Sequence, residues 1–272
     1  MPAPSLDMVG ETHLNPDWLV PQWPAPVNVR AVCTTRAGGA SAAPYDSLNL
    51  GDHVGDHPDC VTANRALLQK NTGAQPVFLS QVHGTDVVDL NHQTGHVTVA
   101  DASVTGQRGL ACTIMVADCL PVLFTNARGT AVAAAHAGWR SLAGQQGQGV
   151  LEGVFKHFEL LAHVGIAPVA TEIIAWLGPC IGPTAFEVGD EVRTAFVQTD
   201  VAALDCFKPK SPGKWWADLP GLARLRLQRL GITQIFGNDG QADWCTVSQP
   251  SRFFSYRRDG ITGRMAACVW LD

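Results

Sequence analysis

The stretch LACTIMVADCLPVLFTNARGTAVAAAHAGWR, residues 110–140, decides the fold class of this chain. It contains three apolar runs, at 110–117, 121–125 and 129–136, which are short and are separated by polar or turn-forming residues. Apolar runs of this length between such residues are typical of buried β-strands. The sequence therefore predicts three buried strands in close succession.

Helices and further strands are expected on both sides of this stretch. Because these elements do not follow a strict βαβ rhythm, the pattern favours an α+β fold over a doubly wound sheet. Apolar spacing, capping residues and terminal glycines predict helices at about 57–73, 150–161, 190–198 and 218–231. The expected strands lie at 27–34, at 75–88 with a bend at 83–84, and at 172–177, 232–236 and 265–271.

The segments between these elements show no sign of a second domain. Residues 1–26 hold Trp18, Trp23 and several prolines, which predict an irregular entry segment. Residues 34–51 are rich in turn residues and predict a long loop, and the stretch around Trp215 and Trp216 is expected to be loosely structured. No repeat, charge block or flexible linker marks a boundary, so we expect residues 27–272 to form a single domain.

The composition narrows the class of protein. A chain of 272 residues with 46% hydrophobic residues is not disordered, and its net charge of −5 gives no support for a nucleic-acid partner. The most apolar stretch, 110–124, is interrupted by Asp118 and is too short to span a bilayer. The start MPAPSLDMVGE lacks the regions of a signal peptide, and we expect the eight cysteines to be reduced. These features predict a cytoplasmic protein with no membrane partner.

Three residues combine a metal-capable side chain with a strand end or a glycine: His83 in SQVHGTD, Cys119 in VADCLP and His136 in AAAHAGW. A thiolate with two imidazoles suits Zn²⁺ and leaves a fourth position open, as in catalytic zinc sites. The same residues also permit a metal-free arrangement, with Cys119 as nucleophile and either histidine as its base. In both arrangements Asp118 is a candidate for orienting a histidine or a metal ligand.

Several other residues are candidates for binding substrate. Arg36 in TTRAGG (34–39) and Arg140 after HAGW can hold phosphate or carboxylate by paired hydrogen bonds, and Arg36 is preferred for phosphate. The alternative for both is a solvated surface charge. His53 in DHVGDH is a further candidate. Cys180 in GPCIGP either contacts the ligand or is packed in a tight turn. Arg257 and Arg258 in RFFSYRRDG form either a subsite for an anion or aromatic ring, or a solvated edge.

Ten motifs in order along the chain resemble the YfiH/YlmD-like family, whose members are also called laccase-domain or multicopper polyphenol oxidoreductase proteins. The resemblance covers most of the chain after residue 26. The motifs are TTRAGG (34–39), YDSLNLG (45–51), HVGD (53–56), NRALL (64–68), QVHG (81–84), ADCLPVLF (117–124), AAHAGWR (134–140), LGPCIGP (177–183), FEVGDEV (186–192) and FFSYRRDGITGRMA (253–266).

The resemblance implies a single α+β unit of layered mixed sheets with flanking helices, similar to certain bacterial cysteine deamidase toxins. It implies that His83, Cys119 and His136 are both catalytic residues and zinc ligands. It adds Asn49, Gln81 and Asp118 to the candidate substrate contacts. The implied substrates are small molecules: a purine nucleoside and phosphate. One departure is the glutamine-rich run at 141–148, where the family usually has a second glycine and a shorter connection.

The activity implied by the resemblance is phosphorolysis of adenosine, inosine and methylthioadenosine, together with hydrolytic deamination of adenosine. Deamination requires a water of lowered pKa, and a bound Zn²⁺ brings the pKa of water toward about 7. Two alternatives stay open: copper-dependent phenol oxidation, with Cu²⁺ in place of zinc, and an amidase that edits peptidoglycan precursors. The chain has no His-x-His pair of the kind that laccase sites use. The sequence does not indicate an oligomeric state.

Overall fold

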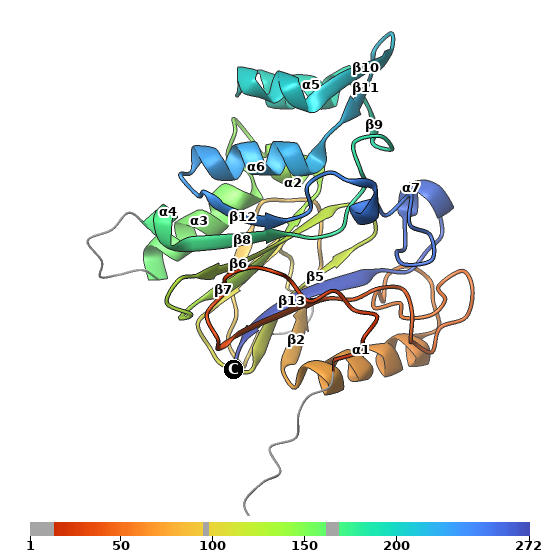
Figure 1. The fold of residues 1–272 in the computed structure, drawn as a ribbon. Helices are drawn as coiled ribbons and strands as arrows, with labels where there is room; N and C mark the ends of the chain where they lie inside the picture. The colour runs from red at the N-terminus through yellow and green to blue at the C-terminus, as the bar shows by residue number, and fades with distance from the viewer. Residues whose placement is uncertain (1–13, 95–97, 162–168) are drawn as a thin grey trace, which may run out of the picture.

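The computed structural model describes residues 14–94, 98–161 and 169–272. Its centre is a pair of mixed β-sheets stacked face to face (Figure 1). The four-stranded sheet has the order β1-β13-β5-β2, and the six-stranded sheet has the order β12-β8-β6-β7-β4-β3. In the first sheet the strands are β1 (Val29–Cys33), β2 (Gln75–Phe78), β5 (Leu110–Val116) and β13 (Met265–Leu271); in the second they are β3 (Val87–Asp89), β4 (Ala102–Thr105), β6 (Leu120–Asn126), β7 (Val132–Ala137), β8 (Ile173–Leu177) and β12 (Gln234–Gly237).

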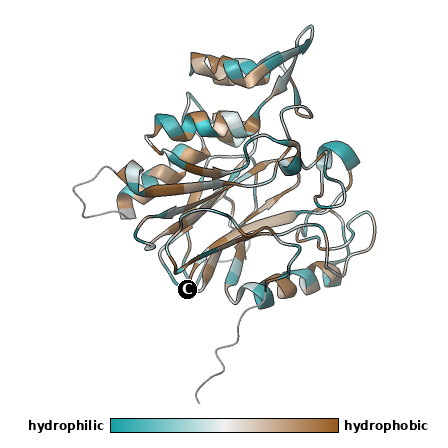
Figure 2. Ribbon diagram, viewed as in Figure 1, coloured by the Kyte–Doolittle hydropathy of each residue, from teal (hydrophilic) through white to brown (hydrophobic). Residues whose placement is uncertain are grey.

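Helices cover the outer faces of the two sheets, so the molecule has four layers. Figure 1 shows α1 on the outer side of the four-stranded sheet and α3 and α6 on the outer side of the six-stranded sheet. Figure 2 shows that α1 and α6 each carry hydrophobic and hydrophilic residues, as helices with one buried side must. The helices are α1 (Pro58–Thr72), α2 (Trp139–Ala143), α3 (Val150–Leu161), α4 (Val169–Glu172), α5 (Asp190–Val197), α6 (Leu219–Arg229) and α7 (Tyr256–Asp259), with 3₁₀ turns at η1 (Val201–Cys206) and η2 (Ala242–Trp244).

Side chains along the central strands point alternately to the two faces of each sheet, so each strand contributes to two apolar layers of the core. In β6, Val122 and Phe124 face the helices α3 and α6, whereas Leu123 faces the other sheet. In β5, Ile114 lies between the sheets, whereas Met115 faces α1 on the outer side. Because successive side chains of a strand point to opposite faces, each strand contributes to two apolar layers and appears in the sequence as an unbroken apolar run.

The structure confirms the α+β fold of layered mixed sheets with flanking helices, and it confirms the three strands expected in residues 110–140. It adds that β5 and β6 belong to different sheets, so the chain crosses between the sheets at residues 117–119. The strands expected at 75–88 are likewise split, because β2 pairs with β5 and β3 pairs with β4. The bend at 83–84 is therefore a second crossing between the sheets.

The expectation of a loosely structured stretch around Trp215 and Trp216 is wrong. These residues lie in a strand that pairs with its neighbours on both sides in a small antiparallel sheet. Its sequence, KWWA, is only four residues long and follows the stretch KPKSPG (208–213), so it lacks the longer apolar run that marked the larger sheets. The three strands are β9 (Glu187–Gly189), β10 (Phe207–Ser211) and β11 (Lys214–Ala217).

The expected entry segment at 1–26 is described only from residue 14 onward, and residues 1–13 lie outside the described part. Between residues 14 and 26 the chain has no helix or strand, and an isolated bridge joins Leu19 to Cys33. All eight cysteines are free thiols. Within the described ranges, no helix is both long and apolar enough to cross a membrane.

A buried ion pair joins α6 to α3 and to the glutamine-rich connection at 141–148. Arg226 Nε donates to Glu152 Oε1 at 2.9 Å, and the side chains are only 6% and 9% exposed. Arg226 also donates to the carbonyl of Gly147, and Glu152 accepts from the backbone N–H of Gly149 at 2.8 Å. The pair therefore fixes the connection that follows α2.

We expect Arg226→Met to lower the free energy of unfolding by about 3–5 kcal/mol, because it leaves the buried Glu152 carboxylate without its counter-charge. Chemical denaturation measures the change. Arg30→Met is the matched control: it removes the exposed pair with Asp272 at 2.7 Å, which is worth at most about 1 kcal/mol. Equal losses in the two variants would contradict the prediction.

Candidate metal centre

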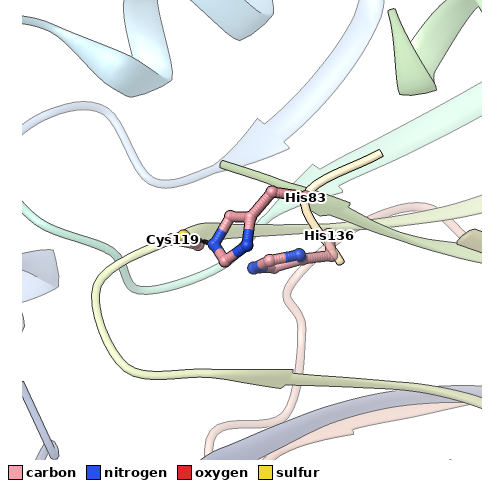
Figure 3. Close-up of side chains that lie close together, drawn as sticks. All are labelled: His83, Cys119 and His136. Atoms are coloured by element: carbon pink, nitrogen blue, oxygen red, sulfur yellow. Dashed lines mark hydrogen bonds between the residues drawn. The ribbon is translucent and has the colours of Figure 1, made fainter. Parts of the chain in front are cut away.

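His83, Cys119 and His136 come together from three separate segments. Figure 3 shows the two imidazoles and the thiol facing a common point. One ligand atom from each residue lies within 4.8 Å of the other two, and Cys119 Sγ is 3.7 Å from His83 Nε2. In the described part of the chain, this is the single group of three potential metal ligands. The three residues, which the sequence places at or beside strand ends, are therefore close together in the fold.

The two sheet crossings position two of these ligands. His83 lies in the crossing between β2 and β3, and Cys119 lies in the crossing between β5 and β6. Both crossings contain a residue with positive φ: His83 itself at 60° and Asp118 at 102°. Such a φ is uncommon outside glycine, and it marks a backbone held by its surroundings.

His136 is positioned by the register of β7. Pro121 of β6 pairs with His136, so the residues just before β6 lie next to the end of β7. Val132 and Ala134 of β7 face the other sheet, and His136 follows in the same alternation. The imidazole is therefore directed into the space between the sheets, where Cys119 enters.

The fully buried carboxylate of Asp101 connects the two histidines. It accepts hydrogen bonds from the backbone N–H groups of Val82 at 3.1 Å, His83 at 2.9 Å and Gly84 at 2.6 Å. It also lies 2.8 Å from His136 Nδ1, which as an N–H donates to the carboxylate and leaves Nε2 free for the ligand cluster. Burial alone would raise the pKa of Asp101, but His136 and these N–H groups outweigh burial and lower it.

The thiol and the buried imidazole each favour the charged form of the other. Burial opposes the charged form of Cys119, but the nearby His136 and then His83 outweigh it and lower the pKa of the thiol from 9.0 to about 6. Burial likewise opposes the charged form of His136, and Cys119 with Asp101 raises its pKa from 6.5 to about 9. A thiolate is the form of cysteine that binds a metal or attacks an electrophile, so both alternatives from the sequence remain chemically competent.

The donor set and its spacing fit a tetrahedral metal. With Zn–S near 2.3 Å and Zn–N near 2.0–2.1 Å, a tetrahedral site places sulfur and nitrogen donors about 3.6 Å apart. The observed Sγ to Nε2 distance of 3.7 Å agrees with that value. Space for the cluster depends on Gly138, where a Cβ would lie 3.0 Å from both Cys119 Sγ and His83 Cδ2.

The three ligands open onto a cavity of about 440 Å³. This volume lies within the range of about 300–1,000 Å³ that is usual for small-molecule sites. Of the candidate substrate contacts, His53, Gln81, Asp118 and Arg257 line the cavity. The rest of the lining consists of Met115, Val116, Ala117, Trp139, Ile181, Phe186, Leu219, Tyr256 and Arg264.

The arginine preferred for phosphate lies elsewhere. Arg36 forms an ion pair with Asp46 at 3.1 Å and donates to the carbonyl of Pro250 at 3.0 Å, so its guanidinium is already engaged away from the cavity lining. Arg140 is exposed and lies over the ring of Trp139, 4.4 Å from the ring centroid. The structure does not bring either guanidinium to the cavity lining.

Three more candidates support the cavity wall without lining it. Asn49 accepts from the backbone N–H of Arg264 at 2.8 Å. Cys180 is fully buried and receives a hydrogen bond from Asn238 at 3.4 Å, as in the packed-turn alternative. Arg258 donates to several backbone carbonyls, including that of Thr246 at 2.6 Å. A direct role in binding substrate remains a prediction for all of the candidates.

Sequence reasoning missed Asp101, Tyr256 as a lining residue, and Arg264. Tyr256 and Arg264 both fall inside the motif FFSYRRDGITGRMA, so the resemblance already contained a signal for them. Asp101 had no such signal, because it lies outside the ten motifs and its partners Gly84 and His136 are 17 and 35 residues away in the sequence.

We expect Gly138→Ala to weaken binding of Zn²⁺, because the added methyl group meets two ligand side chains. Gly138 has φ −64° and ψ 161°, which alanine adopts without strain, so the thermal unfolding temperature should change little. Competition with a chromophoric chelator measures the affinity. Gly106→Ala is the control, since its methyl group would meet only the Thr130 carbonyl at 3.1 Å; an equal loss in that variant would refute the prediction.

We expect Asp101→Asn to weaken Zn²⁺ binding by about 10- to 100-fold, the usual effect of losing the carboxylate behind a histidine ligand. The same chelator competition provides the measurement, at a temperature where melting curves show both proteins folded. Asp89→Asn removes a carboxylate that lies 3.9 Å from His157, outside the ligand cluster, and should leave the affinity unchanged. Unaltered affinity in Asp101→Asn would show that the carboxylate does not support the ligands.

Several relatives match almost the whole chain. A purine nucleoside phosphorylase of Pseudomonas aeruginosa is 49% identical over 256 residues, covering 94% of this chain and 98% of the relative. The purine nucleoside phosphorylase YfiH of Escherichia coli is 50% identical over 255 residues, covering 93% and 98%.

Solved structures share the fold. A Neisseria meningitidis protein superimposes with a TM-score of 0.84 at 46% identity, covering 94% of this chain and 99% of that chain. YlmD from Geobacillus stearothermophilus superimposes with a TM-score of 0.81 at 30% identity, covering 93% and 96%. Residues 30–272 match the family described as multi-copper polyphenol oxidoreductase laccase. The chain thus belongs to this laccase-like family, and the YfiH/YlmD resemblance seen in its motifs is confirmed.

Proposed function

We propose that this chain is a purine nucleoside phosphorylase whose active site is the cavity at His83, Cys119 and His136. The observation that carries the proposal is a cavity with metal-binding side chains and two arginines in one lining. The names of the relatives from Pseudomonas aeruginosa and Escherichia coli support it. The proposed substrates are adenosine, inosine and methylthioadenosine, each with inorganic phosphate.

Phosphorolysis sets three demands on the site. A phosphate oxygen forms a bond to ribose C1′ while the bond from C1′ to purine N9 breaks. The bonding electrons leave with the purine, which takes up a proton. The site must therefore hold an anion beside C1′, hold a planar ring, and supply a proton donor.

The lining offers a group for each demand. Arg257 supplies a cation for the anion, and Trp139, Phe186 and Ile181 supply apolar surface for the purine and ribose. His53 and Tyr256 carry exchangeable protons in the same lining. The apolar residues also keep water from competing with phosphate.

The residues present fit zinc as the resident metal. His83, Cys119 and His136 would hold the ion, which when bound supplies Lewis acidity. A copper site of the electron-transfer kind adds a weak methionine ligand to two histidines and a cysteine. The methionine in this lining, Met115, instead places its sulfur 3.9 Å from Arg65 Nη2, toward the outer core. This arrangement favours an open zinc site over such a copper site.

Hydrolytic deamination of adenosine is the second activity that we propose. A set of histidine and cysteine ligands with one open position resembles the zinc sites of nucleobase deaminases. Those enzymes use a carboxylate as acid and base, and Asp118 is the carboxylate in this lining. Its two oxygens accept from Thr246 Oγ1 and from the backbone N–H of Arg257, both at 2.6 Å.

The test is incubation of the zinc-loaded protein with adenosine, with and without phosphate, followed by product identification. We expect adenine and ribose 1-phosphate with phosphate, and inosine without it. Cys119→Ser should lose zinc and slow both reactions by at least about 100-fold, the scale on which ligand-shell losses affect activity. Cys60→Ser in α1 is the control and should retain zinc and both activities.

Other outcomes would replace the proposal. Unchanged adenosine under both conditions would refute it. Oxidation of a phenolic dye by the copper-loaded protein would establish the oxidase alternative, and release of an amino acid from a peptidoglycan precursor would establish the editing amidase.

A further inference from the structure

Two arginines line the cavity, and neither forms an ion pair with a carboxylate of the described residues. Seven of the fourteen arginines in the chain do form such a pair. The lack of a partner in the lining matters because a partly desolvated cation without a counter-charge is costly unless a ligand provides one. The seven pairs are Arg30–Asp272, Arg36–Asp46, Arg65–Asp52, Arg128–Glu172, Arg226–Glu152, Arg229–Asp200 and Arg258–Asp259.

Arg264 is held in place on one side only. Its Nη1 donates to the carbonyls of Thr262 and Gly263 at 3.1 Å, and its stem packs so closely on Gly51 that a Cβ there would lie 2.8 Å from Arg264 Cγ. Its Nε and Nη2 meet no acceptor among the described residues. Burial lowers the pKa of the guanidinium, because a charge that is partly removed from water is less well solvated.

Arg257 stands in the same lining with a similarly incomplete set of partners. Its Nη1 donates to the carbonyl of Glu187 at 3.1 Å, and the guanidinium carbon lies 5.6 Å from the ring centroid of Phe186. Its Nε and Nη2 also meet no acceptor within the described ranges. The ring centroid of Tyr256, the residue before Arg257, lies 5.9 Å from the Arg264 guanidinium, and all three residues belong to the same lining.

The negative groups nearby do not form an ion pair with either arginine, and the Glu187 carboxylate, which interacts electrostatically with Arg257, is paired with Lys210. Asp118 uses both carboxylate oxygens on Thr246 and on the backbone of Arg257, and Cys119 faces the two histidines. These charges raise the pKa of Arg264 against the opposing effect of burial, which shows that they are felt at the guanidinium. Neither of them forms an ion pair with it.

We propose that Arg264, with Arg257 beside it, forms an oxyanion subsite that binds inorganic phosphate. Two guanidiniums with free N–H groups offer the forked donors that match the oxygens of a tetrahedral anion. The assignment of this anion as a co-substrate rests on the proposed phosphorylase function. It replaces Arg36, whose guanidinium already has Asp46 and Pro250 as partners.

The first experiment is steady-state phosphorolysis of inosine at varied phosphate by the zinc-loaded protein. Arg264→Met should raise the KM for phosphate by about 10- to 100-fold, the range for losing charge-assisted hydrogen bonds, and leave the KM for inosine and the zinc content nearly unchanged. Arg264→Lys keeps the positive charge but lacks the forked N–H donors, so its KM for phosphate should lie between those of the wild type and Arg264→Met. Arg30→Met removes an exposed arginine and should behave as the wild type.

A second experiment separates the subsite from the reaction. Equilibrium dialysis with radiolabelled phosphate, with and without adenine present, should show one bound phosphate in the wild type and weakened binding in Arg264→Met. Arg264-dependent binding without any phosphorolysis would uphold the subsite while the proposed function fails. No phosphate binding by the wild type, an unchanged phosphate KM in Arg264→Met, or Arg264-dependent binding of adenosine 5′-monophosphate but not of inorganic phosphate would overturn the proposal.

Discussion

The buried carboxylate of Asp101 is the interaction on which the rest of the site depends. A fully buried charge persists only where hydrogen bonds replace its water, and Asp101 receives them from three consecutive backbone N–H groups at 82–84 and from the ring of His136. One side chain thereby fixes the backbone that carries His83 and the ring orientation of His136. Its own position follows from the sheet, since the next residue, Ala102, pairs with Ala135 of β7. The register between β4 and β7 therefore sets the geometry of the ligands.

The cavity exists because the chain passes from one sheet to the other twice in the same region. A crossing between stacked sheets leaves backbone that cannot continue a ladder, and here the crossings hold His83 and Asp118 at positive φ. Asp118 is stabilised there by Thr246 and by the N–H of Arg257, which ties the crossing at 117–119 to the C-terminal segment. The same bonds that support the strained turn bring Arg257 to the lining, so the metal ligands and the cationic residues are parts of one construction.

The sequence was informative wherever a local pattern corresponds to a buried element. The runs at 110–117, 121–125 and 129–136 became β5, β6 and β7, because strands buried on both faces carry no polar alternation. The strand with Trp215 and Trp216 escaped prediction because its neighbours are lysine, proline and glycine. Long-range partners escaped for a different reason. The sequence shows that Arg36 is a cation near glycines, but it does not show that Asp46 forms an ion pair with it. Nor does it show that Arg264, 228 residues further on, has no carboxylate partner within the described ranges. Likewise, Asp101 and His136 are joined only once β4 lies beside β7.

The two activities that we propose make different demands on one cavity, and the lining has a chemical basis for both. Phosphorolysis acts at ribose C1′ and needs an anion held nearby, whereas deamination acts at purine C6 and needs hydrolytic chemistry at that atom. If the site held only one nucleophile, the nucleoside would have to bind in two orientations to present C1′ and C6 to it in turn. In this lining the metal ligands and the unpaired arginines are separate groups, with Trp139, Phe186 and Ile181 as apolar surface in the same cavity. One bound nucleoside would then face a hydrolytic centre and a phosphate subsite at different atoms. The chemistry at each atom would be decided by whether phosphate occupies the arginine subsite.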